Sequence, residues 1–168
     1  MSVGKGGDDD LAGGAGADEL RGGAGDDRLT IDADDTVFQG GSGTDTAVVT
    51  GDTGMEIHLS NHGLEKVLGG AQRDFLEAGG VDQGVTLSGG GGDDPVVGGD
   101  YDDQLAGGTG DDKLKGRAGA DTLSGGAGDD GMRGGAGDDL IEGGAGDDAA
   151  RGGAGDDRIF GGAGSDGK

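Results

Sequence analysis

A nine-residue repeat constrains the fold of this chain more than any other feature. From Gly89 onward the sequence consists of eight consecutive nine-residue units and a shortened ninth. Most units carry glycine at positions one, two and four, aspartate at position six and an apolar residue at position eight, as in GGAGDDLIE from Gly134. Glycines allow a tight turn, and in the extended residues that follow, the middle side chain points to one face. The repeat therefore predicts a solenoid of short strands joined by turns.

The same repeat opens the chain, and an irregular stretch separates the two arrays. Five units run in phase from Gly4 to Val48, although the fourth has lost its glycines. Residues 49–88 keep alternating apolar residues and turn signals but break the nine-residue period. This stretch is too short to bury a core of its own, so we expect a wider, metal-poor section of one solenoid. The predicted segments are 1–48, 49–88 and 89–168, and the fold class is all-β, a parallel β-roll or β-helix solenoid.

Composition indicates that something must neutralise the chain before it folds. The formal net charge is −23, from 35 acidic against 12 basic residues, and only 30% of residues are hydrophobic. Such a chain is expected to be disordered on its own. The regular spacing of the acids favours a metal over a protein partner, and an acidic chain repels the phosphates of nucleic acid. The absence of cysteine excludes disulfides and thiolate metal sites, and no apolar run reaches the ~18 residues of a membrane span.

The position-six aspartates are the candidate metal ligands. If two units make one coil, residues 18 apart stack along one edge of the solenoid. One edge of the C-terminal array then carries Asp94, Asp112, Asp130, Asp148 and Asp166. The other edge carries Asp103, Asp121, Asp139 and Asp157. In the N-terminal array Asp9, Asp27 and Asp45 stack, whereas Asp18 faces Thr36 and is expected to form an incomplete site.

The chemistry of this donor set favours calcium. A cation between two stacked turns would meet carboxylates from both coils together with backbone carbonyls. Six or more oxygens at flexible geometry suit Ca²⁺, and the absence of sulfur and of a histidine cluster argues against zinc or copper. Counting the stacked pairs predicts about nine Ca²⁺ ions between the turns. Because the paired acids recur in nearly every unit, we interpret them as structural and expect no enzyme activity.

Two other groups of side chains leave alternatives open. His58 and His62 stand four residues apart, but their segment is predicted to be strand and turn, so we expect solvent-exposed histidines rather than a zinc site. Arg133 and Arg151 occupy equivalent positions two units apart, so they are predicted to stack in neighbouring coils. They either relieve charge on a solvated strand face or bind an acidic polysaccharide.

These units, the acidic balance and the lack of cysteine resemble the RTX, or hemolysin-type calcium-binding, proteins of bacteria. The resemblance covers nearly the whole chain, and GLEKVLGG from Gly63 is similar to a segment that often leads into such arrays. It implies export by a type I secretion machine through an uncleaved C-terminal signal, and folding on extracellular calcium. The expected location is extracellular or the cell surface. No hydrophobic tail follows the final GGAGSDGK, so either the signal is missing or the chain is a piece of a larger protein.

Three functions are compatible with these observations. The first is a non-enzymatic calcium-binding β-roll that uses the metal to fold and serves as a structural or secretion module. The second is the RTX portion of a secreted enzyme or adhesin, since such segments accompany proteases, lipases and alginate epimerases in the family. The third is a self-assembling surface or filament protein, because the repeats run to both ends and a second copy stacked head to tail would continue them.

Overall fold

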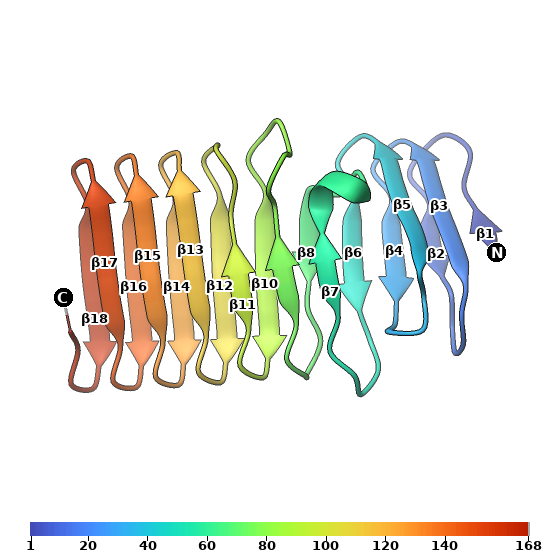
Figure 1. Ribbon diagram of the computed structural model, residues 1–168. Helices are drawn as coiled ribbons and strands as arrows, with labels where there is room; N and C mark the ends of the chain where they lie inside the picture. The colour runs from blue at the N-terminus through green and yellow to red at the C-terminus, as the bar shows by residue number, and fades with distance from the viewer. Residues whose placement is uncertain (168) are drawn as a thin grey trace.

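The computed structural model describes residues 1–167, so Lys168, the last residue of the predicted C-terminal segment, lies outside it. The chain winds into a parallel β-solenoid in which consecutive coils stack along one axis (Figure 1). The predicted all-β solenoid is confirmed. In the described part of the chain the only helical element is a 3-10 turn, η1 (Leu59–Asn61), and no helix there has the length and apolar character needed to cross a membrane.

One side of the solenoid is a continuous nine-stranded parallel sheet, ordered β18-β16-β14-β12-β10-β8-β6-β4-β2. Its strands are β2 (Asp10–Ala12), β4 (Arg28–Ile31), β6 (Thr46–Val49), β8 (Lys66–Leu68), β10 (Thr86–Gly91), β12 (Gln104–Thr109), β14 (Thr122–Ala127), β16 (Leu140–Ala145) and β18 (Arg158–Ala163).

The other side is divided into two sheets. A three-stranded sheet contains β1 (Ser2–Val3), β3 (Glu19–Ala24) and β5 (Val37–Ser42). A six-stranded sheet contains β7 (Glu56–His58), β9 (Phe75–Glu77), β11 (Pro95–Val97), β13 (Lys113–Ala118), β15 (Gly131–Ala136) and β17 (Ala149–Ala154). In the regular coils the strands run on through the first two glycines of the next unit, so they are six residues long and the turns are shorter than the sequence predicts.

Strand register measures the length of each coil. In the arrays each coil spans two units, as shown by Leu105 opposite Leu123 and Leu20 opposite Phe38. In the middle of the chain the spacing grows, because Val67 pairs with Leu87 in one sheet. In the six-stranded sheet Ile57 pairs with Leu76. The middle segment therefore continues the nine-stranded sheet and adds one or two residues to each coil.

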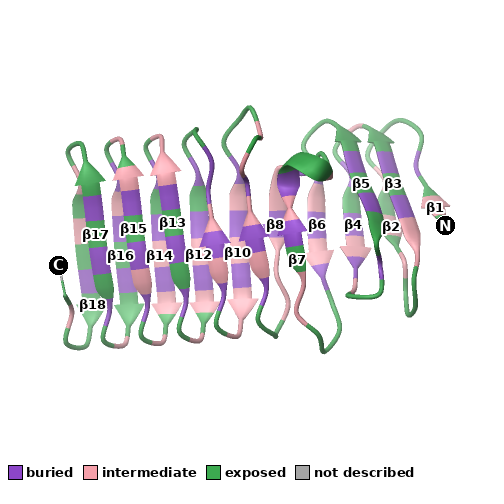
Figure 2. Ribbon diagram, viewed as in Figure 1, coloured by how far each residue is buried: buried purple, intermediate pink, exposed green. Residues whose placement is uncertain are grey.

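The core is one cluster of apolar side chains between the facing sheets. Figure 2 shows buried positions recurring along the strands of the solenoid. The core is formed by inward-pointing residues, which occupy position eight of the regular units, because neighbours in a strand point to opposite faces. The fully or nearly buried members include Leu20, Leu29, Phe38, Ile57, Leu59, Leu64, Val67, Leu76, Leu87, Val96, Leu105, Leu114, Leu123, Met132 and Ile141. Ala47 and Ala150 occupy the same position of their units but fill less of the core.

The break between β5 and β7 differs from what the sequence predicts. The strand expected to alternate from Met55 to Leu59 ends at His58, and Leu59 begins η1 with its side chain buried. His62, which follows η1, stacks on Phe38 with ring centroids 4.0 Å apart and donates a hydrogen bond from Nδ1 to Phe38 O at 2.8 Å. Both histidines were expected to be exposed, but each is half-buried, His62 against Phe38 and His58 against Phe75 and Glu77.

Candidate metal centre

The position-six aspartates form ladders along both edges of the solenoid. In each ladder the backbone N–H of one aspartate donates to Oδ1 of the aspartate one coil further on. All nine stacked pairs expected from the sequence make this contact, at N···O distances between 2.8 and 3.3 Å. The pairs are Asp9–Asp27, Asp27–Asp45, Asp94–Asp112, Asp112–Asp130, Asp130–Asp148, Asp148–Asp166, Asp103–Asp121, Asp121–Asp139 and Asp139–Asp157.

The other carboxylate oxygen, Oδ2, distinguishes a subset of these aspartates. In eight of them Oδ2 is buried and has no hydrogen-bond partner among the described residues. These eight are Asp27, Asp45, Asp94, Asp112, Asp121, Asp130, Asp139 and Asp148. A buried carboxylate oxygen without a partner is costly unless a cation or a proton satisfies it. The remaining predicted ligands Asp9, Asp18, Asp157 and Asp166 are half-buried, and Asp103 is buried but partnered.

The first glycine of each unit shapes the space that Oδ2 faces. A Cβ placed on Gly125 would overlap Asp130 Oδ2 and would lie 2.6 Å from the carbonyl oxygen of Gly143, one coil on. The equivalent position at Gly116 would meet Asp121 Oδ2 and lie 2.7 Å from Gly134 O. A carboxylate oxygen and a backbone carbonyl oxygen thus converge where only glycine leaves room.

Burial also raises the pKa of seven carboxyl groups in the ladders. Removal from water is the largest cause, and it outweighs the lowering effect of the backbone N–H that each group accepts. Burial with nearby carboxylates raises the pKa of Asp94 and of Asp121 to about 7 and that of Asp130 to about 6. The pKa is raised for the same leading reason at Asp45, Asp103, Asp112 and Asp139. Without a cation, these carboxyl groups therefore hold a proton more tightly than an exposed aspartate does.

Three buried aspartates satisfy both carboxylate oxygens with protein donors instead. Asp74 accepts the N–H of Met55 at Oδ1 and that of Gly70 at Oδ2, both at 2.7 Å. Asp103 accepts from Val85 at 2.9 Å and from Gly99 at 2.6 Å. Asp35 accepts from Asp18 and Asp32. Their carboxylates are held without a metal, and all three lie next to irregular coils.

The structure corrects one pairing and adds three acidic residues that the sequence argument missed. Asp18 does not face Thr36: its N–H donates to Asp35 Oδ1 at 2.8 Å, because the turn before β5 places the residue ahead of Thr36 in the ladder. Glu65 accepts the Asp45 N–H at Oε2 and extends that ladder into the middle segment. Asp74 donates its N–H to Asp94 Oδ1. The signal for Asp74 was present, since it is the sixth residue of the weak unit that begins at Gly69.

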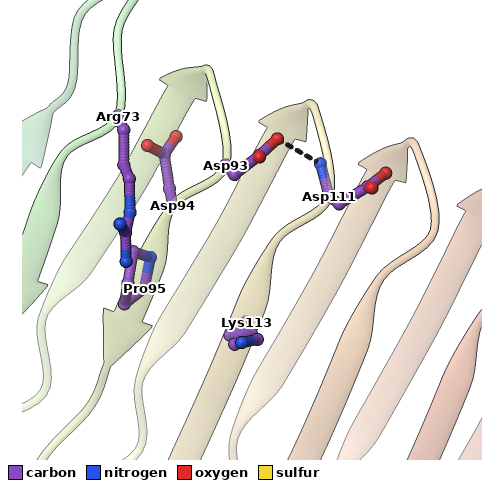
Figure 3. Close-up of a pocket in the computed structure, with 6 residues that line it drawn as sticks. All are labelled: Arg73, Asp93, Asp94, Pro95, Asp111 and Lys113. Atoms are coloured by element: carbon purple, nitrogen blue, oxygen red, sulfur yellow. Dashed lines mark hydrogen bonds between the residues drawn. The ribbon is translucent and has the colours of Figure 1, made fainter.

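A second, exposed row of carboxylates follows the outer side of the turns. The residue before each position-six aspartate is often also an aspartate, and its Oδ1 accepts a backbone N–H from the next coil. Figure 3 shows one such contact, from the Asp111 N–H to Asp93 at 3.0 Å, beside the buried Asp94. Asp111 and Asp129 repeat the contact with the following coils. This row faces solvent, so it adds negative charge outside the candidate sites.

The donor set fits Ca²⁺ without a cluster of side chains. Within residues 1–167 no three or more His, Cys, Asp or Glu side chains converge on one point. A cation in the ladders would therefore take carboxylate oxygens from stacked aspartates and complete its shell with backbone carbonyls. Such oxygen-only coordination by few side chains and several carbonyls is compatible with the six to eight ligands of Ca²⁺.

Comparison with protein families agrees with this geometry. The family described as RTX calcium-binding nonapeptide repeat (4 copies) matches residues 3–38, 97–132 and 133–167, well over half of the chain. The chain belongs to this RTX family. The three matches fall on the two RTX arrays and leave the whole middle segment, residues 49–88, unmatched, as the longer coils there would lead one to expect. Comparison with curated proteins gave no match. The chain is therefore an RTX calcium-binding repeat β-roll with buried aspartates suited to Ca²⁺.

Proposed function

We propose that this RTX β-roll folds when it binds Ca²⁺ outside the cell and serves as a structural or secretion module without enzyme activity. The observation that carries the proposal is the set of eight buried Oδ2 atoms without a partner in the described chain. Together with a formal net charge of −23, these atoms make the metal-free coil costly at neutral pH. A divalent cation supplies the missing partner and the missing charge.

The proposed ligands are the thirteen position-six aspartates predicted from the sequence, and about nine ions would occupy the nine stacked pairs. Five pairs have an unpartnered Oδ2 on both members and are the best-formed sites: Asp27–Asp45, Asp94–Asp112, Asp112–Asp130, Asp130–Asp148 and Asp121–Asp139. Asp103 already uses both oxygens, so its pair with Asp121 depends more on the Asp121 side. We expect the five pairs to fill first.

Magnitudes favour an extracellular location. With a dissociation constant of ~10⁻⁴ M, typical of extracellular calcium modules, and ~1 mM calcium, each site contributes ~1.4 kcal/mol. About nine sites then contribute on the order of 10 kcal/mol, as much as the stability of a whole domain. At cytosolic calcium of ~10⁻⁷ M the same expression gives almost nothing. A chain with these sites would stay unfolded until export, as a type I secretion substrate requires.

The three segments then have different roles. Segments 1–48 and 89–168 are calcium-dependent arrays, and segment 49–88 is a wider, metal-poor connector within the same solenoid. One support is the change of register in the middle, where each coil is one or two residues longer than in the arrays. The other is the lack of unpartnered Oδ2 atoms between Asp45 and Asp94 among the described residues.

A calcium titration followed by far-UV circular dichroism tests the proposal. Starting from chelator, we expect β-structure to appear cooperatively near ~10⁻⁴ M Ca²⁺, and calorimetry to count about nine ions. Magnesium at the same concentration is the matched control and should fold the chain poorly, because it keeps its waters and demands a tighter octahedron. Full β-structure in chelator at neutral pH would contradict the proposal.

The same β-roll is compatible with two alternative functions. It can be the RTX portion of a secreted enzyme or adhesin, or it can assemble with copies of itself. β2 and β18 each have a single neighbour in the nine-stranded sheet, which supports head-to-tail stacking of two copies. Light scattering in millimolar calcium tests the second function: growth of long particles is expected from stacking, and a monodisperse ~16 kDa particle at high concentration would exclude it.

A further inference from the structure

The outer face of the six-stranded sheet carries a row of basic side chains. The inward residues of β11, β13, β15 and β17 are Val96, Leu114, Met132 and Ala150, so their strand neighbours point outward. On these four strands the outward residues are Pro95, Val97, Lys113, Lys115, Gly131, Arg133, Ala149 and Arg151. None of them is acidic. Register places Lys115 opposite Arg133, and Arg133 opposite Arg151.

This row stands out against the rest of the molecule. The whole chain has only 12 basic residues against 35 acidic ones. Within residues 1–167 no carboxylate lies at ion-pair distance from the four basic side chains of the row, all of which are exposed. At equivalent positions of the opposite sheet, β10, β12 and β14 carry Thr86, Ser88, Gln104, Ala106, Thr122 and Ser124, and β16 and β18 carry Leu140, Glu142, Arg158 and Phe160. Arg158 has no basic partner in the neighbouring strand, so a row of stacked basic residues is a property of one face.

The alignment is unfavourable for the free protein. Neighbouring strands lie ~4.8 Å apart, so the cations of Lys115, Arg133 and Arg151 repeat at that spacing along the solenoid axis. Like charges directly opposite one another in a sheet are destabilising. A row of anions would remove this repulsion, and guanidinium groups accept planar carboxylate or sulfate groups with two parallel hydrogen bonds.

The surroundings of the row limit the shape of the partner. Exposed aspartates flank it on both edges of the solenoid, Asp93, Asp111, Asp129 and Asp147 on one and Asp102, Asp138 and Asp156 on the other. Beside the arginines, two residues earlier on the same strands, Gly131 and Ala149 have little or no side chain to obstruct the face. At one end a pocket of about 310 Å³ is lined by Arg73, Pro95 and Lys113 and, on the side of the turns, by Asp93, Asp94 and Asp111 (Figure 3). The face therefore suits a slender anionic chain lying along the axis.

We propose that this face binds a linear anionic polysaccharide, with Lys115, Arg133 and Arg151 pairing with successive acidic groups of the polymer. A DNA duplex is a poorer match, because its two strands carry one charge per ~1.7 Å and its width would bring phosphates over the aspartate rows. The proposal depends on the proposed function only in that calcium is expected to keep the coils stacked, which aligns the row.

The test compares two double variants of equal charge by calorimetry on the full chain in millimolar calcium. Arg133→Gln/Arg151→Gln removes two cations from the row. Arg28→Gln/Arg158→Gln removes two exposed cations from the opposite sheet. The probes are hyaluronate, which carries carboxylates, and dextran sulfate, with neutral dextran as the polymer control and duplex DNA as the competing class.

We expect the native chain to bind hyaluronate or dextran sulfate but not dextran, and the affinity to fall as salt rises. The row variant should bind on the order of tenfold more weakly and the control variant within about twofold, since each exposed ion pair contributes up to ~1 kcal/mol. No binding to either anionic polymer, equal losses in both variants, or tighter binding to DNA would each overturn the proposal. Circular dichroism on the same samples separates this from a failure of calcium-dependent folding, because any folded sample is a valid test.

Discussion

The C-terminal array, residues 89–167, and the middle segment, residues 49–88, follow the same solenoid path but bury different groups between their coils. The array holds paired aspartates with unpartnered oxygens and one apolar residue per unit. The middle segment has no buried, unpartnered carboxylate oxygen among the described residues, and its fully buried apolar side chains include Ile57, Leu59, Leu64, Val67, Leu76 and Leu87. It contains six acidic residues, against eighteen in residues 89–168.

The difference shows that a solenoid coil can close in two ways. In the array a coil of two regular units leaves carboxylate oxygens for a cation. In the middle segment one or two added residues let backbone N–H groups reach the carboxylate, as Gly70 does at Asp74. On the outer face of the middle segment, Glu77 also contacts both His58 and the guanidinium of Arg117. We therefore expect the array to depend on calcium and the middle segment not to.

Lowering the pH should have the largest effect on the difference between the array and the middle segment, because a proton can replace the cation at a buried carboxylate. The pKa of Asp94 and Asp121 in the folded chain is about 7 and that of Asp130 is about 6, above their ordinary value of 3.8. Groups that bind protons more tightly when folded stabilise the fold below about pH 4, and this stabilisation is lost as pH rises to about 7. In chelator, circular dichroism should therefore show β-structure near pH 4 and its loss by pH 7. Equal spectra across that range would argue against buried, titrating aspartates.

Alanine at the second glycine of a unit should distinguish the two regions next. Gly126 has φ +115° and a Cβ placed there would overlap Gly108 O, so we expect Gly126→Ala to lose about 3 kcal/mol or more. In Gly70→Ala the new Cβ lies 3.4 Å from Val49 Cγ1, an ordinary contact, and the change should stay within about 1 kcal/mol. Urea unfolding at saturating calcium measures both. Similar losses would mean that the backbone of the array does not require glycine at this position.

Removing an aspartate should change metal binding in the array and stability alone in the middle segment. Asp130→Ala takes a carboxylate from two stacked pairs, so calorimetry should count about two fewer ions. Asp74→Ala leaves the N–H groups of Met55 and Gly70 without acceptors, which should cost about 1–3 kcal/mol while the ion count stays the same. Loss of ions from the Asp74 variant would show that the middle segment also binds calcium.

The smallest expected effect concerns Arg117, the one non-glycine residue with positive φ among the described residues, at +90°. Most other units have glycine at this second position. Arg117→Gly and Arg117→Ala both lose the contact with Glu77, but only glycine relieves the backbone. The glycine variant should therefore be more stable than the alanine variant by about 1 kcal/mol in thermal or urea unfolding. Equal stabilities of the two variants would show that the positive φ at Arg117 does not strain the backbone.

The period of the sequence was sufficient to predict the solenoid, the stacking of equivalent residues two units apart and the nine aspartate pairs. Each follows from a strict spacing of glycine, aspartate and an apolar residue. The errors lie where the chain departs from the nine-residue period. Asp35 replaces Thr36 in its ladder because the turn before β5 has no glycines, and Asp74 stacks with Asp94 across a coil longer than two regular units.

Other features depend on contacts that the period does not encode. Whether an aspartate Oδ2 receives the N–H of the second glycine depends on that glycine's backbone conformation: Gly70 and Gly99 donate, whereas their equivalents in other units, such as Gly126 and Gly144, have positive φ. At the split between β5 and β7, His62 stacks on Phe38, which lies 24 residues earlier in the sequence. Both are consequences of the folded coil rather than of local sequence.

Amide hydrogen exchange, measured strand by strand before and after addition of chelator, tests the central claim most directly. In millimolar calcium we expect slow exchange throughout the stacked sheets, because their backbone N–H groups are paired. After chelation at neutral pH, β12–β17 should lose protection first and β7–β10 last, since the latter are held by apolar packing. Protection of β12–β17 that persists in chelator, or earlier loss in β7–β10, would contradict the assignment of calcium to the aspartate ladders.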